Sequence, residues 1–378
     1  MLKILHIIPN LGKGGAERLV LDICHQLNKY DGIMTSIFCF SSINDFQEYG
    51  QELDIEIINA GISLSLYKKN NCRTEELRRA IEKLKPDIIH SHLFVAEIVS
   101  RSVLYPDARW FSHCHDNMVQ FENFSWKTLF SKQKLTNFYE KKYLMRCYKK
   151  NGGTRFIAIS NDAKKYFEKT ASLYPVTMLH NAIDYRRFYR AREYRNDSSK
   201  IRLVNTGSFV DKKNQKFLIE VAKVLSDKNI DFELHFLGDG DNRAVLEEKA
   251  LALQLSDCVF FHGNIHNVEE ILWNSDIYLH SATYEPLGLA LIEAMAAGLP
   301  VITLDGRGNR DLIEQGKNGY MLFEQNAEEF TLKINELWKD KTKYREISRY
   351  AQEFAGKFDI KEYVDKLLTL YREAITNC

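Results

Sequence analysis

Short runs of apolar residues alternate with amphipathic segments along the whole chain. The runs are rich in Val, Ile, Leu and Phe and show no polar face, which is typical of strands buried in a parallel sheet. In the first half, strands are predicted at Ile4–Pro9, Thr35–Phe40, Asp87–His90, Arg109–Ser112, Phe156–Ile159 and Val176–Leu179. In the second half, they are predicted at Ile201–Thr206, Phe232–Leu237, Cys258–Phe261, Asp276–Leu279 and Pro300–Thr303. Helical periodicity lies between them, for example over Ala16–Asn28, Thr74–Lys85 and Asp162–Lys169.

The alternation starts again after residue 200, so the pattern predicts an α/β chain with two doubly wound domains. The polar stretch Arg186–Lys200 has no strand pattern and is the natural linker. Helical spacing also covers the last ~50 residues. The 378 residues fit two domains of roughly 100–200 residues each. The expected boundaries are residues 1–185 for the first domain, 186–200 for the linker, 201–355 for the second domain and 356–378 for a C-terminal helix.

The composition is that of a globular protein, with 45% hydrophobic and 27% charged residues, which excludes collagen-like and disordered chains. The seven cysteines are scattered without a C-x-x-C pair, which favours reduced thiols in the cytoplasm over a disulfide framework. The first apolar run stops at Pro9 and is too short for a signal peptide. Glu293 and Pro300 interrupt the longest apolar stretch, Leu287–Leu304, so no transmembrane helix is predicted.

A glycine-rich loop, with Gly12, Gly14 and Gly15, follows the first predicted strand and precedes a helix. Glycines at such a place let backbone N–H groups approach a phosphate or a sugar closely. The G-x-G-x-x-G fingerprint of dinucleotide-binding domains would need a third glycine at position 17, where the chain has Glu17. A plain tight turn remains the alternative for this loop.

The segment 275–302 holds two glutamates around a predicted helix start. Glu285 and Pro286 lie in the loop after a strand, and the helix is predicted from about Leu287 to Ala297. The free N–H groups of its first turn can hold a phosphate, with Glu285 before them and Glu293 two turns later. A nucleotide sugar has this layout, because its diphosphate lies between two sets of hydroxyls. The alternative is a pair of solvated acids, but the helix around Glu293 is apolar nearly all round, which disfavours it.

This segment resembles the Glu-x7-Glu motif of the family 4 retaining glycosyltransferases, which have the GT-B fold. Bacterial capsular, exopolysaccharide and lipopolysaccharide glycosyltransferases are similar. The resemblance implies two Rossmann-like domains facing across a cleft, an N-terminal one for the acceptor and a C-terminal one for the nucleotide sugar. It also implies that the C-terminal helix crosses back to the N-terminal domain. The matching motifs, in chain order, are residues 8–18, 87–94, 111–117, 156–167, 178–184, 207–222, 236–248, 260–265 and 275–323.

The resemblance gives roles to five residues that would bind the donor. Glu285 would hold hydroxyls of the sugar, and Glu293 would hold the ribose. Backbone groups of Gly288 and Leu289 would bind the distal phosphate. Lys213 matches the lysine that neutralises the leaving pyrophosphate, and it counts with Glu285 among the expected catalytic residues.

The resemblance also implies that Gly14 and Gly15 close over the donor. The family usually has an arginine where this chain has Ser208, so one cationic contact is missing, and Lys212 or Arg243 is expected to compensate. The base pocket would be lined, largely through backbone groups, by His262, Gly263, Asn264 and Ile265.

Two histidines, His113 and His115, end a predicted strand, and a family histidine at this place lies near the anomeric carbon. The sequence does not decide between them, and His115 is preferred. A histidine at a strand end is more often structural, but the resemblance favours a catalytic role here. His90 and His92 follow another strand and are candidates for the acceptor side.

No Asp-x-Asp triplet for a divalent metal is present in a suitable place, and Asp239–Asp241 is interpreted as a turn that opens a helix. No metal and no cofactor are therefore expected. The donor is expected to be a UDP- or GDP-sugar and the acceptor a saccharide, free or lipid-linked. In a retaining transfer, Lys213 and the helix start would stabilise the leaving diphosphate. One of its oxygens could take the acceptor's proton.

The charge is uneven, although Lys and Arg (52) nearly balance Asp and Glu (51) overall. Residues 1–200 carry 31 basic and 22 acidic residues, and residues 201–378 carry 21 and 29. Much of the excess lies in residues 124–150, which hold eight basic residues and one Glu among seven aromatic residues. This favours a peripheral contact with an anionic membrane, on the cytoplasmic face of the inner membrane. The expected membrane-facing residues are Trp126, Lys127, Lys132, Lys134, Lys141 and Lys142.

Three alternatives stay open. The basic segment fits an ordinary domain helix whose aromatic residues belong to the core; nucleic acid is disfavoured because no recognition motif accompanies it. The whole chain could be a nucleotide-sugar 2-epimerase, which shares the GT-B architecture. It could also be a non-catalytic nucleotide-sugar-binding protein, given Ser208.

Overall fold

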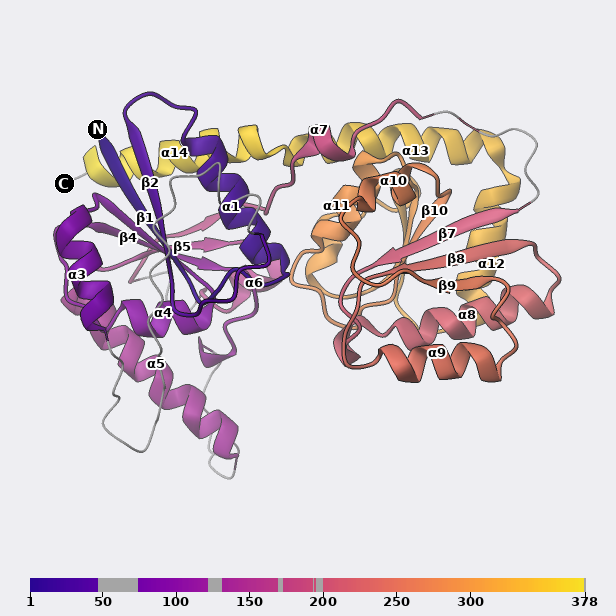
Figure 1. The fold of residues 1–378 in the computed structure, drawn as a ribbon, viewed down its shortest axis with the longest axis horizontal. Helices are drawn as coiled ribbons and strands as arrows, with labels where there is room; N and C mark the ends of the chain where they lie inside the picture. Colours follow the sequence, from indigo (N-terminus) through magenta and orange to yellow (C-terminus); the bar gives the residue numbers. More distant parts are fainter. Residues whose placement is uncertain (47–73, 122–130, 169–172, 193, 195–199, 377–378) are drawn as a thin grey trace. The chain divides into compact units, whose positions relative to one another are not determined.

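The computed structural model describes residues 1–46, 74–121, 131–168, 173–192, 194 and 200–376. The chain forms two compact units (Figure 1). Unit 1 consists of Met1–Asn181 together with Ile360–Cys378, and unit 2 consists of Ala182–Asp359. Each unit contains a six-stranded parallel sheet, which confirms the prediction of two doubly wound α/β domains.

The sheet of unit 1 has the strand order β2-β1-β3-β4-β5-β6. The order changes direction between β1 and β3, and in open α/β sheets ligands bind beyond the carboxyl ends of the strands at such a point. The strands are β1 (Leu2–Ile8), β2 (Ile33–Cys39), β3 (Ile88–His92), β4 (Arg109–Cys114), β5 (Arg155–Ala158) and β6 (Val176–Met178).

Helices and apolar side chains cover both faces of this sheet (Figure 1). Hydroxyl side chains cap two of the helices, since Ser131 accepts from Lys134 N and Ser160 from Ala163 N. The helices of the amino-terminal part are α1 (Gly15–Leu27), α3 (Glu75–Leu84), α4 (Phe94–Ser100), α5 (Lys132–Lys150) and α6 (Asn161–Lys165).

The last helix, α14 (Ile360–Thr376), belongs to unit 1 although unit 2 precedes it in the chain. It packs against α1 and β4. Its buried face includes Tyr363, Leu367 and Tyr371, and the Arg109 Nε donates to its Ala374 carbonyl at 3.1 Å. The expected return of the C-terminal helix to the N-terminal domain is therefore confirmed.

The sheet of unit 2 has the order β12-β11-β10-β7-β8-β9, which changes direction between β7 and β10. Its strands are β7 (Ile201–Thr206), β8 (Phe232–Leu237), β9 (Val259–Phe261), β10 (Ile277–His280), β11 (Val301–Leu304) and β12 (Gly319–Leu322). Strand β12 was not predicted, because a glycine begins this short edge strand and interrupts the apolar pattern. A Cβ at Gly319 would lie 2.3 Å from the Val301 carbonyl oxygen, so the pairing of β12 with β11 needs this glycine.

The helices of unit 2 surround one large apolar core. They are α7 (Tyr185–Phe188), α8 (Gln215–Asp227), α9 (Arg243–Ala252), α10 (Val268–Trp273), α11 (Leu289–Ala296), α12 (Ala327–Lys339) and α13 (Lys341–Ala355). Short 3-10 turns lie at η3 (Asp211–Lys213), η4 (Gly308–Asp311) and η5 (Gly356–Phe358). Within the described ranges, no helix has both the length and the apolar character needed to cross a membrane.

Candidate active site

The switch point of the unit 2 sheet brings Lys213 and Glu285 together. Strands β7 and β10 are neighbours in the sheet, although more than 70 residues separate them in the chain. Lys213 ends the turn η3 after β7, and Glu285 lies in the loop after β10. The Lys213 Nζ lies 2.5 Å from the Glu285 Oε2. The two predicted donor-binding side chains therefore form a direct ion pair at the edge of the sheet where ligands bind.

Backbone contacts fix the two loops that carry this pair. The Ser281 hydroxyl donates to the Lys213 carbonyl at 2.8 Å, and the Thr283 N–H donates to the Lys212 carbonyl at 2.9 Å. On the other side, the Glu285 N–H donates to the Gly306 carbonyl at 2.8 Å. The position of the pair is thus set by main-chain geometry and does not depend on the two long side chains alone.

Glu285 is an ionised carboxylate in a nearly water-free place. Its residue is 7% exposed. Burial alone would raise the pKa of Glu285, but the Lys213 ammonium and His280 outweigh it and lower this pKa to about 2. The His280 Nε2 lies 3.2 Å from Glu285 Oε2. An ionised carboxylate only accepts hydrogen bonds, so this group suits the hydroxyls of a sugar.

The helix after Glu285 starts two residues later than predicted. We expected its start at about Leu287, whereas α11 begins at Leu289. Gly288 precedes it with φ +104°, a left-handed conformation that favours glycine, and its Cβ would lie 2.3 Å from the Leu291 Cδ1. No side chain caps this helix. The N–H groups of Gly288 and Leu289 therefore lie at an uncovered helix start beside Glu285, which suits an anion.

Glycines also allow a second loop to pack directly on Glu285. A Cβ at Gly308 would lie 1.9 Å from the Pro286 carbonyl oxygen, and the Gly308 N–H donates to the Glu285 carbonyl at 3.0 Å. The Asn309 side chain accepts from the Gly306 N–H at 2.9 Å and donates to the carbonyl of Leu304. This loop after β11 therefore acts as a second support for the glutamate.

Glu293 lies on the second turn of α11 and is half-buried. Burial raises the pKa of Tyr278, and the carboxylates of Glu293 and Glu285 both contribute to this increase. The two predicted donor-binding carboxylates therefore lie near the same tyrosine. This placement differs from that of a solvated residue on an outer helix face.

The predicted base pocket follows β9. The His262 N–H donates to the Phe236 carbonyl at 3.0 Å, and the Gly263 carbonyl accepts from Gly238 N–H at 2.8 Å, so backbone bonds hold this segment. His262 is exposed and its Nε2 lies 2.9 Å from the Nδ1 of His235. Asn264 is exposed, Ile265 is half-buried, and Gly263 has φ +68°.

Two cations, Lys212 and Arg243, were candidates to compensate for Ser208, and Arg243 forms ion pairs at the start of α9. The guanidinium of Arg243 contacts Asp239 at 3.2 Å and Glu247 at 2.8 Å. Asp239–Asp241 forms the predicted turn before α9, with Asp239 accepting from the Gly240 N–H at 2.8 Å. The Lys212 Nζ lies 5.9 Å from the Tyr284 ring centre, in the loop that leads to Glu285.

In unit 1, the glycine-rich loop lies at the carboxyl end of β1. Gly14 precedes α1, and a Cβ there would lie 2.1 Å from the Glu17 Oε2. Gly15 is the first residue of the helix. Burial raises the pKa of Glu17, which lies in the first turn. This glutamate occupies the place of the third glycine of the dinucleotide motif, so its side chain fills the space that Gly14 leaves.

His113 and His115 belong to a buried histidine cluster at the switch point of unit 1. Alternate positions of β3 and neighbouring β4 place His90, His92, His113 and His115 on one face of the sheet, and His6 of β1 joins them. All five residues are at most 7% exposed. The cluster is therefore a continuous group of imidazoles that crosses three strands.

His115 lies at the more exposed end of this cluster, with 7% exposure against 2% for His113. Its Nε2 lies 2.9 Å from the His92 Nδ1, and its Nδ1 lies 3.3 Å from the amide of Asn181. Burial lowers the pKa of His115 to about 3 and also lowers that of His113. Both rings are therefore neutral at pH 7, so they can position a substrate by hydrogen bonds but carry no positive charge. Asp116, next in the chain, is exposed.

Sequence reasoning missed several members of these two groups. His280 is the last residue of β10, and a polar residue ending an apolar strand just before the Glu285 loop was a usable signal. His6 interrupts the apolar run of β1 in the same way. No local signal identified Tyr371, which reaches His90 from a helix 281 residues later.

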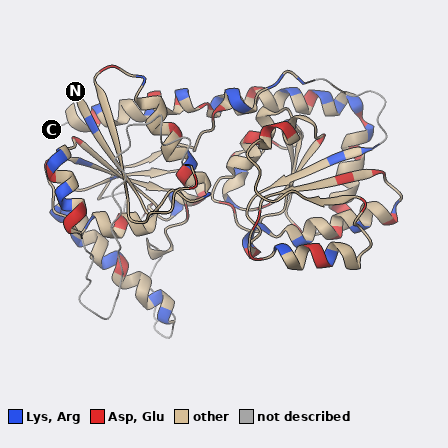
Figure 2. Ribbon diagram, in the orientation of Figure 1, with Lys and Arg blue, Asp and Glu red and all other residues tan. Residues whose placement is uncertain are grey.

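The predicted membrane-facing residues fall into two groups. Trp126 and Lys127 lie outside the described residues. Lys132, Lys134 and Lys142 are exposed on α5, and Figure 2 marks the positions of Lys and Arg along this helix in blue. Lys141 is half-buried and donates to the Phe121 carbonyl at 3.2 Å. The described face includes a shallow concave surface lined by Phe138, Lys141, Lys142, Met145, Arg146 and Lys149.

One aromatic residue of this segment belongs to the core instead. Tyr148 is fully buried, and its ring centre lies 4.9 Å from the Arg101 guanidinium. The alternative of an ordinary domain helix therefore holds for the carboxyl end of α5. The exposed aromatic residue Tyr139 lies nearer its beginning.

Comparisons with known proteins agree with this arrangement. Residues 13–187 match the family model described as Glycosyltransferase Family 4, and residues 188–354 match the model described as Glycosyl transferases group 1. The chain therefore belongs to the GT-B glycosyltransferases, with a family 4 amino-terminal half and a group 1 carboxy-terminal half.

Individual relatives share modest identity. The chain is 26% identical to the glycosyltransferase EpsF of Bacillus subtilis over 329 residues, covering 80% of this chain and 79% of EpsF. It is 30% identical over 169 residues to the lipopolysaccharide core biosynthesis glycosyltransferase LpsE of Rhizobium meliloti, covering 44% of this chain and 48% of LpsE. The crystal structure of Anabaena HepE with UDP and glucose has the same fold, with a TM-score of 0.78 and 19% identity, covering 98% of this chain and all of that chain.

Proposed function

We propose that this protein is a retaining glycosyltransferase of cell-surface polysaccharide synthesis. It transfers a hexose or N-acetylhexosamine from a nucleotide-sugar donor to a saccharide acceptor that is lipid-linked. The observation that carries the proposal is the Lys213–Glu285 pair beside the uncovered start of α11, at the switch point of unit 2. The relatedness to a lipopolysaccharide glycosyltransferase and the UDP-bound HepE structure support it.

The donor is held by carboxylates that accept hydrogen bonds and by N–H groups that donate them. The Glu285 carboxylate accepts hydrogen bonds from the sugar hydroxyls, and Glu293 accepts those from the ribose. The N–H groups of Gly288 and Leu289 bind the distal phosphate at the helix start. Lys213 forms an ion pair with Glu285, and in this proposal its ammonium compensates the charge that grows on the leaving diphosphate as the bond to the sugar breaks.

The acceptor is deprotonated without a dedicated protein base. A distal phosphate oxygen of the leaving diphosphate takes the proton of the attacking hydroxyl on the same face of the sugar, so the anomeric configuration is retained. The neutral imidazole of His115 positions donor or acceptor hydroxyls by hydrogen bonds. Its lowered pKa fits this role and not that of a general acid at pH 7.

The transfer reaction proceeds without Mg²⁺ or Mn²⁺, because Lys213 and the helix start supply the positive charge. We expect equal rates in assays that contain EDTA and in assays to which Mg²⁺ is added back. A rate that rises more than tenfold on adding Mg²⁺ or Mn²⁺ would contradict this part of the proposal.

A matched pair of variants tests the donor site. Lys213→Ala should reduce transfer from the donor sugar nucleotide at least a hundredfold, which is the usual effect of removing one charge-stabilising group. Glu293→Gln should weaken donor binding, because Glu293 accepts hydrogen bonds from the ribose. Lys249 forms a similar ion pair with Glu220, at 2.5 Å and on the outer helices of unit 2, so Lys249→Ala serves as the control and should retain activity. Equal loss in both lysine variants would refute the assignment.

The same assay separates the alternative functions. Conversion of the donor to its 2-epimer without an acceptor would identify an epimerase. Donor binding in a thermal-shift screen, with no turnover in the presence of any acceptor extract, would identify a binding protein. A product whose anomeric proton has the inverted configuration by NMR would refute the retaining mechanism.

The acceptor reaches the protein from an anionic membrane surface, with the exposed lysines of α5 in contact with headgroups. Each such lysine contributes about 1 kcal/mol near an anionic surface. We expect flotation with phosphatidylglycerol vesicles at low salt, and a tenfold or greater reduction in the triple variant Lys132→Glu, Lys134→Glu and Lys142→Glu. Binding that is unchanged by these three substitutions would remove α5 from the proposal.

A further inference from the structure

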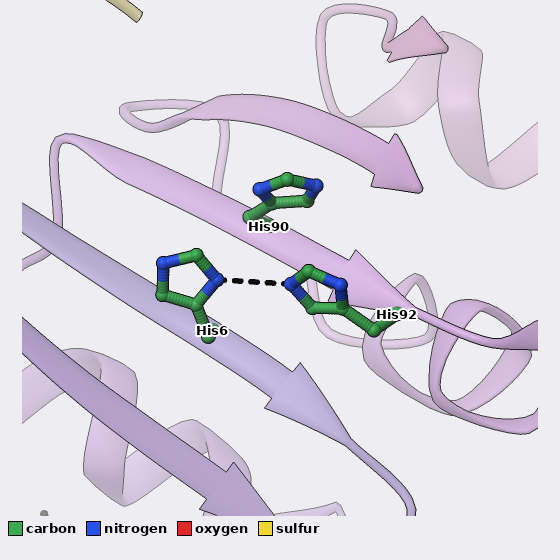
Figure 3. A group of neighbouring side chains, drawn as sticks. All are labelled: His6, His90 and His92. Carbon is green, nitrogen blue, oxygen red and sulfur yellow. Dashed lines mark hydrogen bonds between the residues drawn. The ribbon is translucent and has the colours of Figure 1, made fainter. Parts of the chain in front are cut away.

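Three histidines of the unit 1 cluster approach one another closely. His6 of β1 and His90 of β3 are register partners, and His92 lies two residues further on the same face of β3 (Figure 3). Their ring centres lie 4.2 to 5.3 Å apart. All three residues are fully buried. The group therefore consists of imidazoles that water does not reach.

Two nitrogens of this group lack a partner. Among the described residues, no hydrogen bond reaches the His6 Nε2 or the His90 Nε2. A buried polar atom without a partner costs about 1–3 kcal/mol, and native proteins keep few of them. One nitrogen atom from each of the three rings can act as a ligand, and these three nitrogens all lie within 4.8 Å of one another.

One ring of the group also has a hydrogen-bond partner on the nitrogen that would not bind the metal, as metal-binding histidines usually do. The Tyr371 hydroxyl lies 2.5 Å from the His90 Nδ1, so this nitrogen can donate its proton to the phenol oxygen and leave the Nε2 lone pair free. Neutral imidazole is the form that binds a metal.

We propose that His6, His90 and His92 bind a single divalent transition-metal ion, of the zinc, cobalt or nickel class. Imidazole ligands select these ions, whereas Mg²⁺ and Mn²⁺ prefer oxygen ligands. The proposal is independent of the proposed function and concerns the stability of unit 1. It departs from the expectation of no metal, which considered only Asp-x-Asp sites for Mg²⁺ or Mn²⁺.

Small ring rotations adapt the three side chains to an ion. Zinc–nitrogen bonds of about 2.0–2.1 Å place tetrahedral ligand nitrogens about 3.4 Å apart. The His6 Nδ1 and His92 Nε2 lie 2.9 Å apart in a hydrogen bond, whose proton the ion would replace. The unpartnered His90 Nε2 supplies the third ligand.

A second triad, His92, His113 and His115, has a similar nitrogen spacing. Both nitrogens of His115 contact hydrogen-bonding partners, and only His113 in this triad has unpartnered nitrogens among the described residues. In the first triad, the unpartnered Nε2 of His90 is itself the proposed ligand, and the Tyr371 hydroxyl contacts the other nitrogen of this ring. Because both triads need His92, we expect one ion per chain and assign it to the first triad.

The experiment loads the metal during synthesis, since the site is closed to solvent. The full chain without a polyhistidine tag is expressed in minimal medium with Co²⁺ as the probe, and the bound metal is counted by mass spectrometry after gel filtration. We expect a single Co²⁺ per chain, bound by the three imidazoles. His6→Gln and His90→Gln should each reduce the bound Co²⁺ at least tenfold.

Two control variants identify the site. His113→Gln belongs only to the second triad, and His235→Gln belongs to the histidine pair of unit 2; both should keep the metal. Should a His6 or His90 variant fail to fold, X-ray absorption on the wild-type protein decides, with three imidazoles around the ion expected. Absence of bound metal in the wild type, or its retention in both His6→Gln and His90→Gln, would overturn the proposal. Loss of the bound Co²⁺ in His113→Gln, together with its retention in His6→Gln, would also overturn the proposal and would favour the second triad.

Discussion

Removing the Lys213 ammonium leaves the Glu285 carboxylate buried without its main counterion. The ion pair helps to lower the pKa of Glu285 from 4.5 to about 2, although burial alone would raise it. Each pKa unit corresponds to about 1.36 kcal/mol, so a pKa of about 2 in place of 4.5 represents about 3 kcal/mol at pH 7, to which Lys213 is the largest favourable contributor. That estimate agrees with the destabilisation of roughly 3–5 kcal/mol that is typical when one partner of a buried ion pair is removed. We therefore expect Lys213→Met to destabilise unit 2 by about 3 kcal/mol.

Differential scanning calorimetry measures this effect. A loss of about 3 kcal/mol in a unit of this size lowers its Tm by roughly 6–12 °C. The Lys249→Met variant is the control, because its partner Glu220 is far more exposed than Glu285, and its Tm should change by about 2 °C or less. The double variant Lys213→Met with Glu285→Gln should recover much of the loss, since no unpaired charge is then buried.

The pH dependence of stability tests independently whether the ionised form of Glu285 stabilises the fold. The folded pKa of Glu285 is lower than its unfolded pKa, so the stabilisation is complete above pH 4.5 and disappears as the pH falls from 4.5 towards 2. The Tm difference between wild type and Lys213→Met should therefore shrink over this interval. A difference that is the same at pH 7 and pH 3, or a Tm equal to that of Lys249→Met at pH 7, would refute the reasoning.

Two further predictions concern packing. Gly308→Ala should lower the Tm of unit 2 and reduce transfer at least tenfold, because its Cβ would overlap the Pro286 carbonyl. Gly356→Ala is the control and should leave activity unchanged, because its Cβ would lie 3.8 Å from the Tyr185 Cζ, an ordinary van der Waals distance. Equal activities of the two variants would contradict the role of the loop after β11. Arg101→Met should lower the free energy of unfolding of unit 1 by about 3–5 kcal/mol, measured by calorimetry, because it leaves the buried Glu97, 3.0 Å away, without its ion-pair partner. A decrease below ~1 kcal/mol would show that the pair is dispensable.

The donor half of the site could be predicted from the sequence because each of its parts is local. Glu285, Gly288 and Glu293 lie within one strand–loop–helix segment, so their spacing in the chain indicates their arrangement in space. Lys213 came from a motif in another segment. Its direct contact with Glu285 depends on β7 and β10 being neighbours, and strand order is not a local property.

The histidine cluster could not be predicted from local sequence patterns alone. The alternation in His90-Ser91-His92 and His113-Cys114-His115 places each pair on one side of its strand. That the two pairs meet, and that His6 joins them, follows from the order β1-β3-β4, which no single segment encodes. The return of the C-terminal helix to this domain was predicted, but its contacts with the histidines through Tyr363 and Tyr371 were not.

Helix boundaries and short strands were the least predictable features. Apolar residues at Leu287 predicted a helix start that Gly288, with its positive φ, delays to Leu289. The edge strand Gly319–Leu322 was missed because glycine weakens a strand pattern even where close backbone approach requires it. In α5, the aromatic pattern did not distinguish the buried Tyr148 from the exposed Tyr139.

The discontinuity of unit 1 imposes an order on its biosynthesis. Residues 1–181 leave the ribosome without the helix Ile360–Thr376 that packs on α1 and β4. The intervening 178 residues take about 10–35 s to synthesise at roughly 5–20 residues per second. During this time, the surfaces that Tyr363 and Tyr371 later cover, the histidines among them, face solvent. All residues of unit 2 are therefore synthesised first, and the amino-terminal unit becomes complete only after the helix Ile360–Thr376 has been synthesised.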